Sequence, residues 1–188
     1  MRMRLEEKQG ARGKSAHLLL GAAAFLLLAG CAGKLPDVLM RNYTVEAPFD
    51  ADQARRQMSG NGVVTGEAFM RQNGGGIVTC AAEEVELIPA TEYARERFRI
   101  LNYGDQTEGV RPLIAIRQIT NDYSDFHQLI LKSRCDSRGA FTFKGVGMGD
   151  FYLFTRVTWN VDGGTQGGRL YKLITVDSDQ PVSVIMAP

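Results

Sequence analysis

Cysteine and histidine supply much of the reactive chemistry available to a protein, and this 188-residue chain holds few of them. It has three cysteines, Cys31, Cys80 and Cys135, and two histidines, His17 and His127. A histidine-based metal site takes two or more ligands at a suitable spacing, and the sequence contains no such cluster. The sequence therefore predicts no metal centre and no cofactor.

The usual sequence signatures of catalysis are also missing. There is no Gly-x-Ser-x-Gly turn, no Ser-x-x-Lys and no glycine-rich phosphate loop ahead of a helix. Asp122, Asp125 and Asp136 offer oxygen ligands for Ca²⁺, but their spacing is not that of an EF-hand. Pairs of carboxylates can be chosen in many ways, so none stands out. We predict a protein that is not an enzyme.

The charge balance argues against a nucleic-acid partner. The formal net charge is only +1, from 22 basic and 21 acidic residues. Arg95, Arg97 and Arg99 alternate with acidic residues in a short helix predicted over 91–99. We interpret this run, with Tyr93, as a mostly solvated face; an anion or nucleic-acid site is the alternative.

The first thirty residues are predicted to be a targeting segment outside the fold. Five basic side chains precede an uncharged, Leu- and Ala-rich run over 18–30, which is the layout of a secretory signal. A bilayer-spanning helix needs roughly 20 apolar residues, and this run is shorter. Removing the segment leaves 158 of the 188 residues, enough for a self-sufficient core.

The apolar run ends in Leu28-Ala29-Gly30-Cys31, which resembles the lipobox of bacterial lipoproteins. The resemblance implies cleavage before Cys31 and attachment of palmitate-type acyl chains there. Two or more chains anchor a protein stably, whereas one alone is marginal. Ala32 follows the cysteine, and by resemblance to the sorting rule of enteric-type bacteria this implies the outer membrane, facing the periplasm. Residues 31–48 are then the lipidated N-terminus and a tether.

The remaining residues, 49–188, are predicted to form one mostly β domain. Asp50 is a candidate cap for a short helix over 51–58. Beyond it, short apolar runs broken by glycine are typical of strands and turns. Strands are predicted over 63–70, 83–88, 113–119, 126–134, around 141–143, and over 151–159, 170–176 and 182–186. This even spacing favours an antiparallel β-sandwich with one or two short helices and an insertion around 90–125.

The stretch DSRGAFTFKGVGMGDFYL, residues 136–153, resembles the carboxypeptidase regulatory-like domain, a transthyretin-like β-sandwich. The family often has Asp, two residues, Gly, aromatic residues on one strand face, and Gly-x-Tyr-x-Leu; Phe151 replaces the tyrosine here. Residues 64–68 and 85–88 match earlier elements loosely. The matching positions are Asp136, Gly139, Phe141, Phe143, Val146, Gly149, Phe151 and Leu153. The resemblance implies a non-catalytic module.

Cys80 and Cys135 are an even pair once Cys31 carries lipid, in a compartment that favours disulfides. Cys80 precedes the strand predicted over 83–88, and Cys135 ends the strand predicted over 126–134. If these strands are neighbours, the cysteines come within bonding distance. We predict a structural disulfide; two buried thiols and a redox pair are the alternatives.

Two functions of different class are compatible with these features. The favoured one is a non-catalytic, membrane-anchored lipoprotein of the bacterial cell envelope, a structural or interaction module for envelope proteins or glycans. The alternative is a small periplasmic hydrolase or ligand-binding protein with a site of dispersed residues. Trp159, Tyr152 and Tyr171 are candidates for an aromatic binding platform, although core packing is the commoner fate of such residues.

Lipid attachment at Cys31 can be tested directly. Cys31→Ser is expected to release the protein from the membrane fraction or to block its processing, because the acylated thiol is the anchor. Fractionation followed by mass spectrometry of the mature N-terminus measures both effects. An unmodified N-terminus downstream of Cys31 in native membranes would contradict the prediction.

Overall fold

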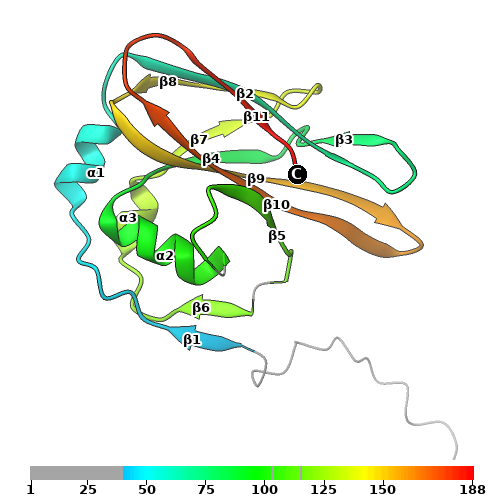
Figure 1. Ribbon diagram of the computed structural model, residues 1–188, viewed down its shortest axis with the longest axis horizontal. Helices are drawn as coiled ribbons and strands as arrows, with labels where there is room; N and C mark the ends of the chain where they lie inside the picture. Colours follow the sequence, from blue (N-terminus) through cyan, green and yellow to red (C-terminus); the bar gives the residue numbers. More distant parts are fainter. Residues whose placement is uncertain (1–39, 103, 115) are drawn as a thin grey trace, which may run out of the picture. The chain divides into compact units, whose positions relative to one another are not determined.

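In a computed structural model, residues 40–102, 104–114 and 116–188 are described, and they form the β-sandwich that the sequence predicts (Figure 1). The predicted signal segment 1–30 and Cys31 lie outside the described residues. Among those described, no helix is long and apolar enough to span a bilayer. Two sheets of five and four strands face each other, and their strands supply the main core.

The larger sheet has the strand order β5-β10-β9-β4-β7 and is antiparallel throughout. Its centre is the long hairpin of two thirteen-residue strands, β9 and β10. The strands are β5 (Glu108–Arg111), β10 (Gly164–Val176), β9 (Gly149–Val161), β4 (Glu84–Pro89) and β7 (Leu131–Arg134).

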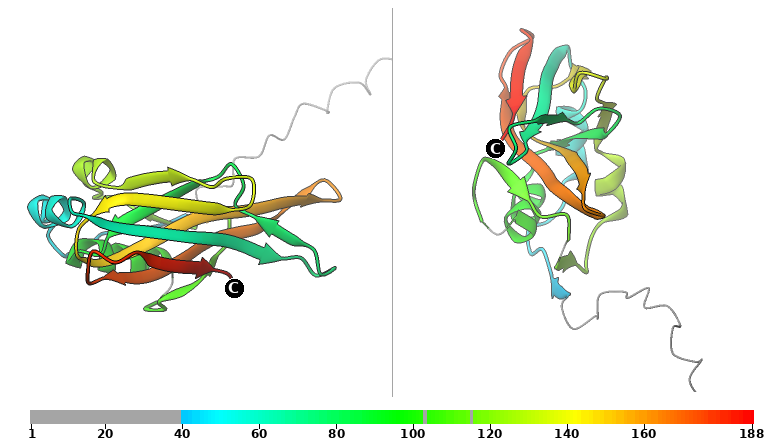
Figure 2. Two further views of the ribbon diagram at one scale, coloured as in Figure 1. Left: turned by 90° about the horizontal axis from the view of Figure 1, so that it is seen from above. Right: turned by 90° about the vertical axis from the view of Figure 1, so that its right-hand side faces the viewer.

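The smaller sheet is built around β2, and it packs face to face with the larger sheet (Figure 2). β2 pairs antiparallel with β3 and β8 and parallel with β11, so the sandwich is not purely antiparallel. Its strands are β2 (Gly62–Arg71), β3 (Ile77–Thr79), β8 (Ala140–Val146) and β11 (Val182–Met186).

The core between the sheets comes from the inward-facing residues of each strand. On β8, Phe141 and Phe143 are buried while Thr142 and Lys144 are exposed, as the alternating pattern predicts. The preceding turn follows its sequence as well. Asp136 Oδ1 accepts hydrogen bonds from the backbone N–H groups of residues 138 and 140, and Gly139 has φ +87°.

A second apolar cluster lies on the outer face of the five-stranded sheet, beneath the insertion. Phe98 of α2 (Glu92–Asn102) stacks on Tyr152 of β9, with centroids 4.0 Å apart and planes 8° apart. α3 (Ser124–Gln128) and the parallel pair of β1 (Arg41–Tyr43) and β6 (Arg117–Ile119) flank α2. α1 (Ala51–Gln57) lies at one end of the sandwich, capped by Asp50 as predicted (Figure 1).

The sequence predicts one or two short helices, and three occur in the described residues. Other local predictions also differ from the structure. The strand predicted over 126–134 begins as α3, and only its second half is β7. Phe126 is buried against Phe49 and Tyr93, a contact that favours the helical turn. Tyr93, predicted on a solvated face, is fully buried because α2 turns that side onto the outer cluster. The strand predicted over 113–119 is confined to β6.

The described part of the predicted tether, 40–48, packs against the insertion. β1 pairs with β6, and Val45 is buried. Asn121 accepts a hydrogen bond from Val45 N–H at 3.0 Å and donates one to the Val45 carbonyl at 2.8 Å. Glu96 of α2 accepts from the N–H groups of Glu46 and Ala47. This part of the segment therefore belongs to the folded unit.

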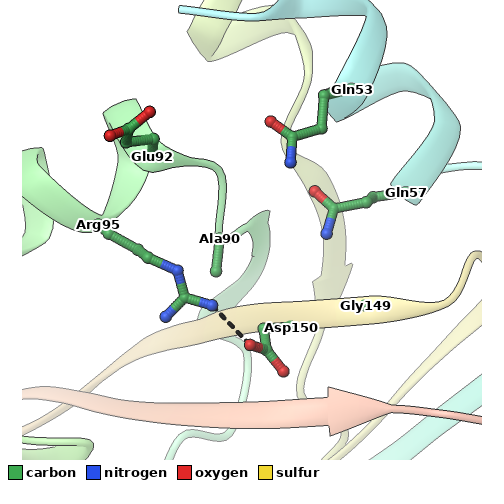
Figure 3. A pocket seen from close by; sticks show the side chains of 7 residues that line it. All are labelled: Gln53, Gln57, Ala90, Glu92, Arg95, Gly149 and Asp150. Atoms are coloured by element: carbon green, nitrogen blue, oxygen red, sulfur yellow. Dashed lines mark hydrogen bonds and ion pairs between the residues drawn. The ribbon is translucent and has the colours of Figure 1, made fainter. Parts of the chain in front are cut away.

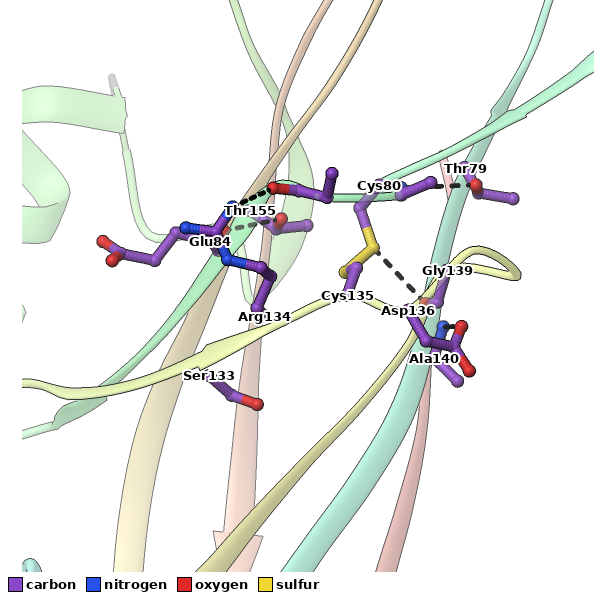
Figure 4. The surroundings of a disulfide bond; sticks show 12 residues. Thr79, Cys80, Glu84, Ser133, Arg134, Cys135, Asp136, Gly139, Ala140 and Thr155 are labelled. Atoms are coloured by element: carbon purple, nitrogen blue, oxygen red, sulfur yellow. Dashed lines mark hydrogen bonds between the residues drawn. A yellow bond between two sulfur atoms is a disulfide. The ribbon is translucent and has the colours of Figure 1, made fainter.

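The predicted disulfide between Cys80 and Cys135 is present, with Cα atoms 5.8 Å apart (Figure 4). As predicted, the adjacent strands β4 and β7 are neighbours, with Glu84 in register with Arg134. Cys80 also follows β3 of the other sheet, and its N–H donates to the Ala68 carbonyl. The bond therefore ties the two sheets together and closes the segment that contains the insertion.

Replacing both cysteines is expected to destabilise the fold strongly. The bond joins residues 55 positions apart, and chain entropy gives such a loop a stabilisation of up to about 4 kcal/mol. Urea unfolding of Cys80→Ala/Cys135→Ala should show a loss approaching that value. Dithiothreitol should weaken the parent protein similarly and leave the double variant unchanged; a parent protein insensitive to reduction would contradict the prediction.

Candidate functional site

The main candidate site is a groove on the outer face of the five-stranded sheet, beside α2. Two adjoining cavities, of about 210 and 160 Å³, share Glu86, Phe154 and Arg169, so they form one depression. We call it the outer groove. It is lined by Glu83, Glu84, Glu86, Ile88, Ala94, Arg97, Phe98, Leu101, Asn102, Arg111, Phe126, His127, Ile130, Tyr152, Phe154, Thr155, Arg156 and Arg169.

The floor of the outer groove follows from strand register. Phe154 of β9 lies opposite Glu86 of β4 on one side and Tyr171 of β10 on the other. Tyr152 and Tyr171 are buried under Phe98, whereas Phe154 is only half-buried and lines both cavities. Phe154 therefore places an aromatic ring in the middle of the floor.

The next register position holds three arginines side by side. Arg169 of β10 pairs with Arg156 of β9 and with Arg111 of β5. Cross-strand partners project from the same face of a sheet, and like charges in that relation are destabilising. We call Arg111, Arg156 and Arg169 the arginine row. The row makes the open end of the groove basic.

The α2 wall is held by a charged network around Asp122. Arg97 donates two hydrogen bonds to this carboxylate, from Nε at 2.9 Å and from Nη2 at 2.8 Å. The Tyr93 hydroxyl donates to it as well, and His127 Nε2 lies 3.1 Å away. Burial raises the pKa of Asp122, but these hydrogen bonds outweigh burial and lower the pKa to about 2. Burial also raises the pKa of Tyr93 well above its ordinary value.

A buried polar atom at the groove lacks a hydrogen-bond partner. Asn102 donates from Nδ2 to the Phe98 carbonyl at 2.9 Å, but its Oδ1 accepts from no described protein group. Buried polar atoms normally have a hydrogen-bond partner, either a protein group or another molecule. Asn102 is therefore a candidate acceptor for a ligand hydroxyl at the inner end of the groove.

A second cavity, of about 430 Å³, opens between α1, the start of α2 and the start of β9 (Figure 3). Gln53 and Gln57 extend into it from α1, and Arg95 pairs with Asp150 at 2.5 Å. A hydrogen bond from Thr175 and the guanidinium of Arg95 lower the pKa of Asp150. This polar pocket has no aromatic lining residue, which distinguishes it from the outer groove.

The structure places the arginines predicted on one helix, and His127, in different surroundings from those predicted. Arg95, Arg97 and Arg99 are ion-paired with Asp150, Asp122 and Asp105, so they are neither a free basic run nor a purely solvated face. His127 lies on α3 and not on a strand.

The aromatic and acidic candidates do not assemble as single sites. Trp159 packs at the edge of the main core, away from Tyr152 and Tyr171 in the outer cluster. Asp122 and Asp136 bond to protein donors at different places. In the described part of the chain, no group of three or more His, Cys, Asp or Glu residues could hold a metal ion.

Sequence reasoning missed Phe154 and the arginine row. Phe154 belongs to an aromatic strand in which every second residue lies in the main core. This alternation predicts that Phe154 faces outward. The three arginines come from separate strands, and only the pairing register reveals them.

Comparison with known proteins shows the fold. No protein-family model and no curated protein matches the chain. Among solved structures, it is similar to a Pseudomonas aeruginosa protein provisionally described as carbohydrate-binding, with 25% identity and a TM-score of 0.59. That alignment covers 76% of this chain and 99% of the other.

Two pilin structures align with this chain more distantly. A minor pilin of Streptococcus agalactiae has 15% identity and a TM-score of 0.36, over 69% of this chain and 44% of its own. The major pilin of Bacillus cereus has 10% identity and a TM-score of 0.35, over 68% and 30%.

Asp122→Asn should destabilise the protein in a pH-dependent way. Because the folded-state pKa of Asp122 lies near 2, below the unfolded value near 3.8, ionisation stabilises the fold above about pH 4. The shift corresponds to about 2 kcal/mol at pH 7. Urea unfolding should show the variant weaker by this amount at pH 7, with the gap closing as pH falls from about 4 to 2. A pH-independent gap would contradict this origin.

Proposed function

We propose that this protein is a non-catalytic glycan-binding module of the bacterial cell envelope, held to the membrane by lipid at Cys31. The binding site is the outer groove, and the domain is a relative of the carboxypeptidase regulatory-like sandwiches that residues 136–153 resemble. The Cys80–Cys135 disulfide and the β-sandwich are compatible with a location outside the cytoplasm, where disulfides persist.

The observation that carries the proposal is the half-buried ring of Phe154, which lines both cavities of the outer groove together with Glu86 and Arg169. Ligand sites combine apolar surface with a few placed polar groups, and a sugar ring offers both an apolar C–H face and a rim of hydroxyls. Phe154 can stack against that face, because the faces of an aromatic ring are electron-rich. Glu86 and Asn102 provide acceptors for hydroxyls on either side.

The Pseudomonas aeruginosa protein supports the same class of ligand. Nearly all of its length aligns with this chain, and carbohydrate binding is its provisional description. The support is at the level of the whole domain, and the choice of the outer groove comes from this chain's own residues.

The carboxylates with a clearly shifted pKa hold the fold together. A general acid for glycoside hydrolysis needs a raised pKa. In Glu96, Asp122, Asp136 and Asp150 the pKa is instead lowered by hydrogen bonds and neighbouring cations. These four carboxylates therefore lack the raised pKa of such an acid.

The position of the anchor fits a ligand close to the membrane. Eight residues separate Cys31 from Met40, the first described residue. Even fully extended, the nine steps from one Cα atom to the next along this stretch span only about 30 Å. A module joined to its lipid anchor by so short a segment contacts glycans close to the membrane surface.

Binding to envelope glycans tests the proposal. Detergent-solubilised full-length protein is mixed with peptidoglycan sacculi or with immobilised lipopolysaccharide, and the bound fraction is measured. We expect saturable binding to one of them, weakened about tenfold by Phe154→Ala through loss of ring stacking. Phe154→Leu, which keeps apolar volume without the ring, should be equally weak, and Phe154→Tyr should restore binding.

Ile185→Ala provides a matched control, because Ile185 is exposed on β11 of the other sheet. It should bind like the parent protein. Binding to neither glycan, or binding unaffected by every Phe154 variant, would overturn the proposed site. Steady release of reducing ends during incubation would instead support a hydrolase.

A further inference from the structure

We propose that the outer groove selects an acidic saccharide, one bearing a single carboxylate or phosphate, whose anionic group is bound by Arg156 and Arg169. The inference rests on the proposed function, since it names the class of glycan that the groove takes. The evidence for the inference is the charge and strand register of the residues at the open end of the groove. This evidence is separate from the Phe154 ring, on which the proposed function depends.

The arginine row brings like charges into direct register. Arg169 pairs with Arg156 across the β9–β10 hairpin and with Arg111 across to β5. Side chains in this relation start from Cβ atoms about 5 Å apart on one face of the sheet. Their mutual repulsion is relieved when an anion lies among the guanidinium groups. An apo site with this arrangement is prepared for a negatively charged ligand.

Carboxylates of the protein do not neutralise the centre of this row. Within residues 40–102, 104–114 and 116–188, the side chains of Arg156 and Arg169 form no ion pair or hydrogen bond. The arginines of α2 behave differently, since each is paired with an aspartate. Arg111 already interacts within the protein, so it contributes charge to the row and is not needed as a ligand.

The opposite side of the groove is acidic, and this limits the ligand to one anionic group. Glu83, Glu84 and Glu86 line the β4 side, and Glu84 forms an ion pair with Lys132 at 2.8 Å. A polyanion lying along the groove would be repelled there. Sugar hydroxyls, by contrast, donate to these carboxylates. The ligand is therefore anionic over β9 and β10 and rich in hydroxyls over β4.

The spacing suits an acidic sugar. Phe154 and Arg156 are two residues apart on the same face of β9, about 7 Å along the strand. That distance is comparable to the length of one hexuronate or hexose phosphate. The ring can rest on Phe154 while its carboxylate or phosphate reaches the guanidinium forks, which bind such groups in a bidentate manner.

Matched ligand pairs test the inference on the full-length protein in detergent. Titration calorimetry compares cellobiouronate with cellobiose, and glucose 6-phosphate with glucose; inorganic phosphate and heparin are separate probes. We expect each acidic member to bind about tenfold or more tightly than its neutral partner. Arg156→Gln and Arg169→Gln should each remove most of that advantage, because the affinity for the acidic member should fall much more than the affinity for its neutral partner. Added NaCl should reduce the advantage.

Arg71→Gln is the control, since Arg71 is exposed at the end of β2 in the other sheet and its replacement gives the same change in net charge. It should retain full preference for the acidic sugars. Circular dichroism verifies that the arginine variants are folded.

The outcomes separate this inference from the proposed function. Equal affinity for acidic and neutral sugars would overturn the inference while glycan binding stands. The inference would also be overturned if inorganic phosphate bound as tightly as glucose 6-phosphate, or if heparin bound more tightly than every other probe. Either result would mean that the site recognises charge and not a saccharide. Failure of all sugars, sacculi and lipopolysaccharide to bind would overturn both.

Discussion

The stacking of Phe98 on Tyr152 is the contact on which the rest of the outer face depends. A five-stranded sheet has two faces, and the smaller sheet covers only one of them. The flat contact at 4.0 Å seats α2 on the other face, over the part of β9 and β10 that carries Tyr152 and Tyr171. Because α2 covers only this part, Phe154 and the arginine row remain at its edge. The groove exists because α2 covers only part of the outer face of the five-stranded sheet.

The insertion that carries this helix is restrained at several points. The Cys80–Cys135 bond closes one covalent loop that runs from β4 to β7 and contains α2, β5, β6 and α3. Asp122 joins α2 to the segment before α3 through Arg97 and Tyr93. A groove wall made of loop-connected pieces needs such restraints, because ordering each residue costs conformational entropy.

The N-terminal segment is coupled to the same wall. Glu96 binds the backbone of Glu46 and Ala47 on one side of α2, while Phe98 faces the sheet on the other. Asn121 holds both backbone groups of Val45. The part of the chain that leads toward Cys31 is therefore attached to the helix that borders the outer groove. In the proposed function, this arrangement sets the groove's distance from the membrane.

The sequence by itself determined the β class, the Asp136–Gly139 turn, the cap at Asp50, most strand positions and the cysteine pairing. Each of these follows from local rules: alternation, turn chemistry, capping and an even number of cysteines. The same rules misassigned Phe126 and Tyr93, because the aromatic cluster beneath the insertion decided their environment. Only the tertiary structure identified the groove. Arg111, Arg156 and Arg169 become neighbours through strand register, and register is a relation between distant segments that local sequence patterns do not contain.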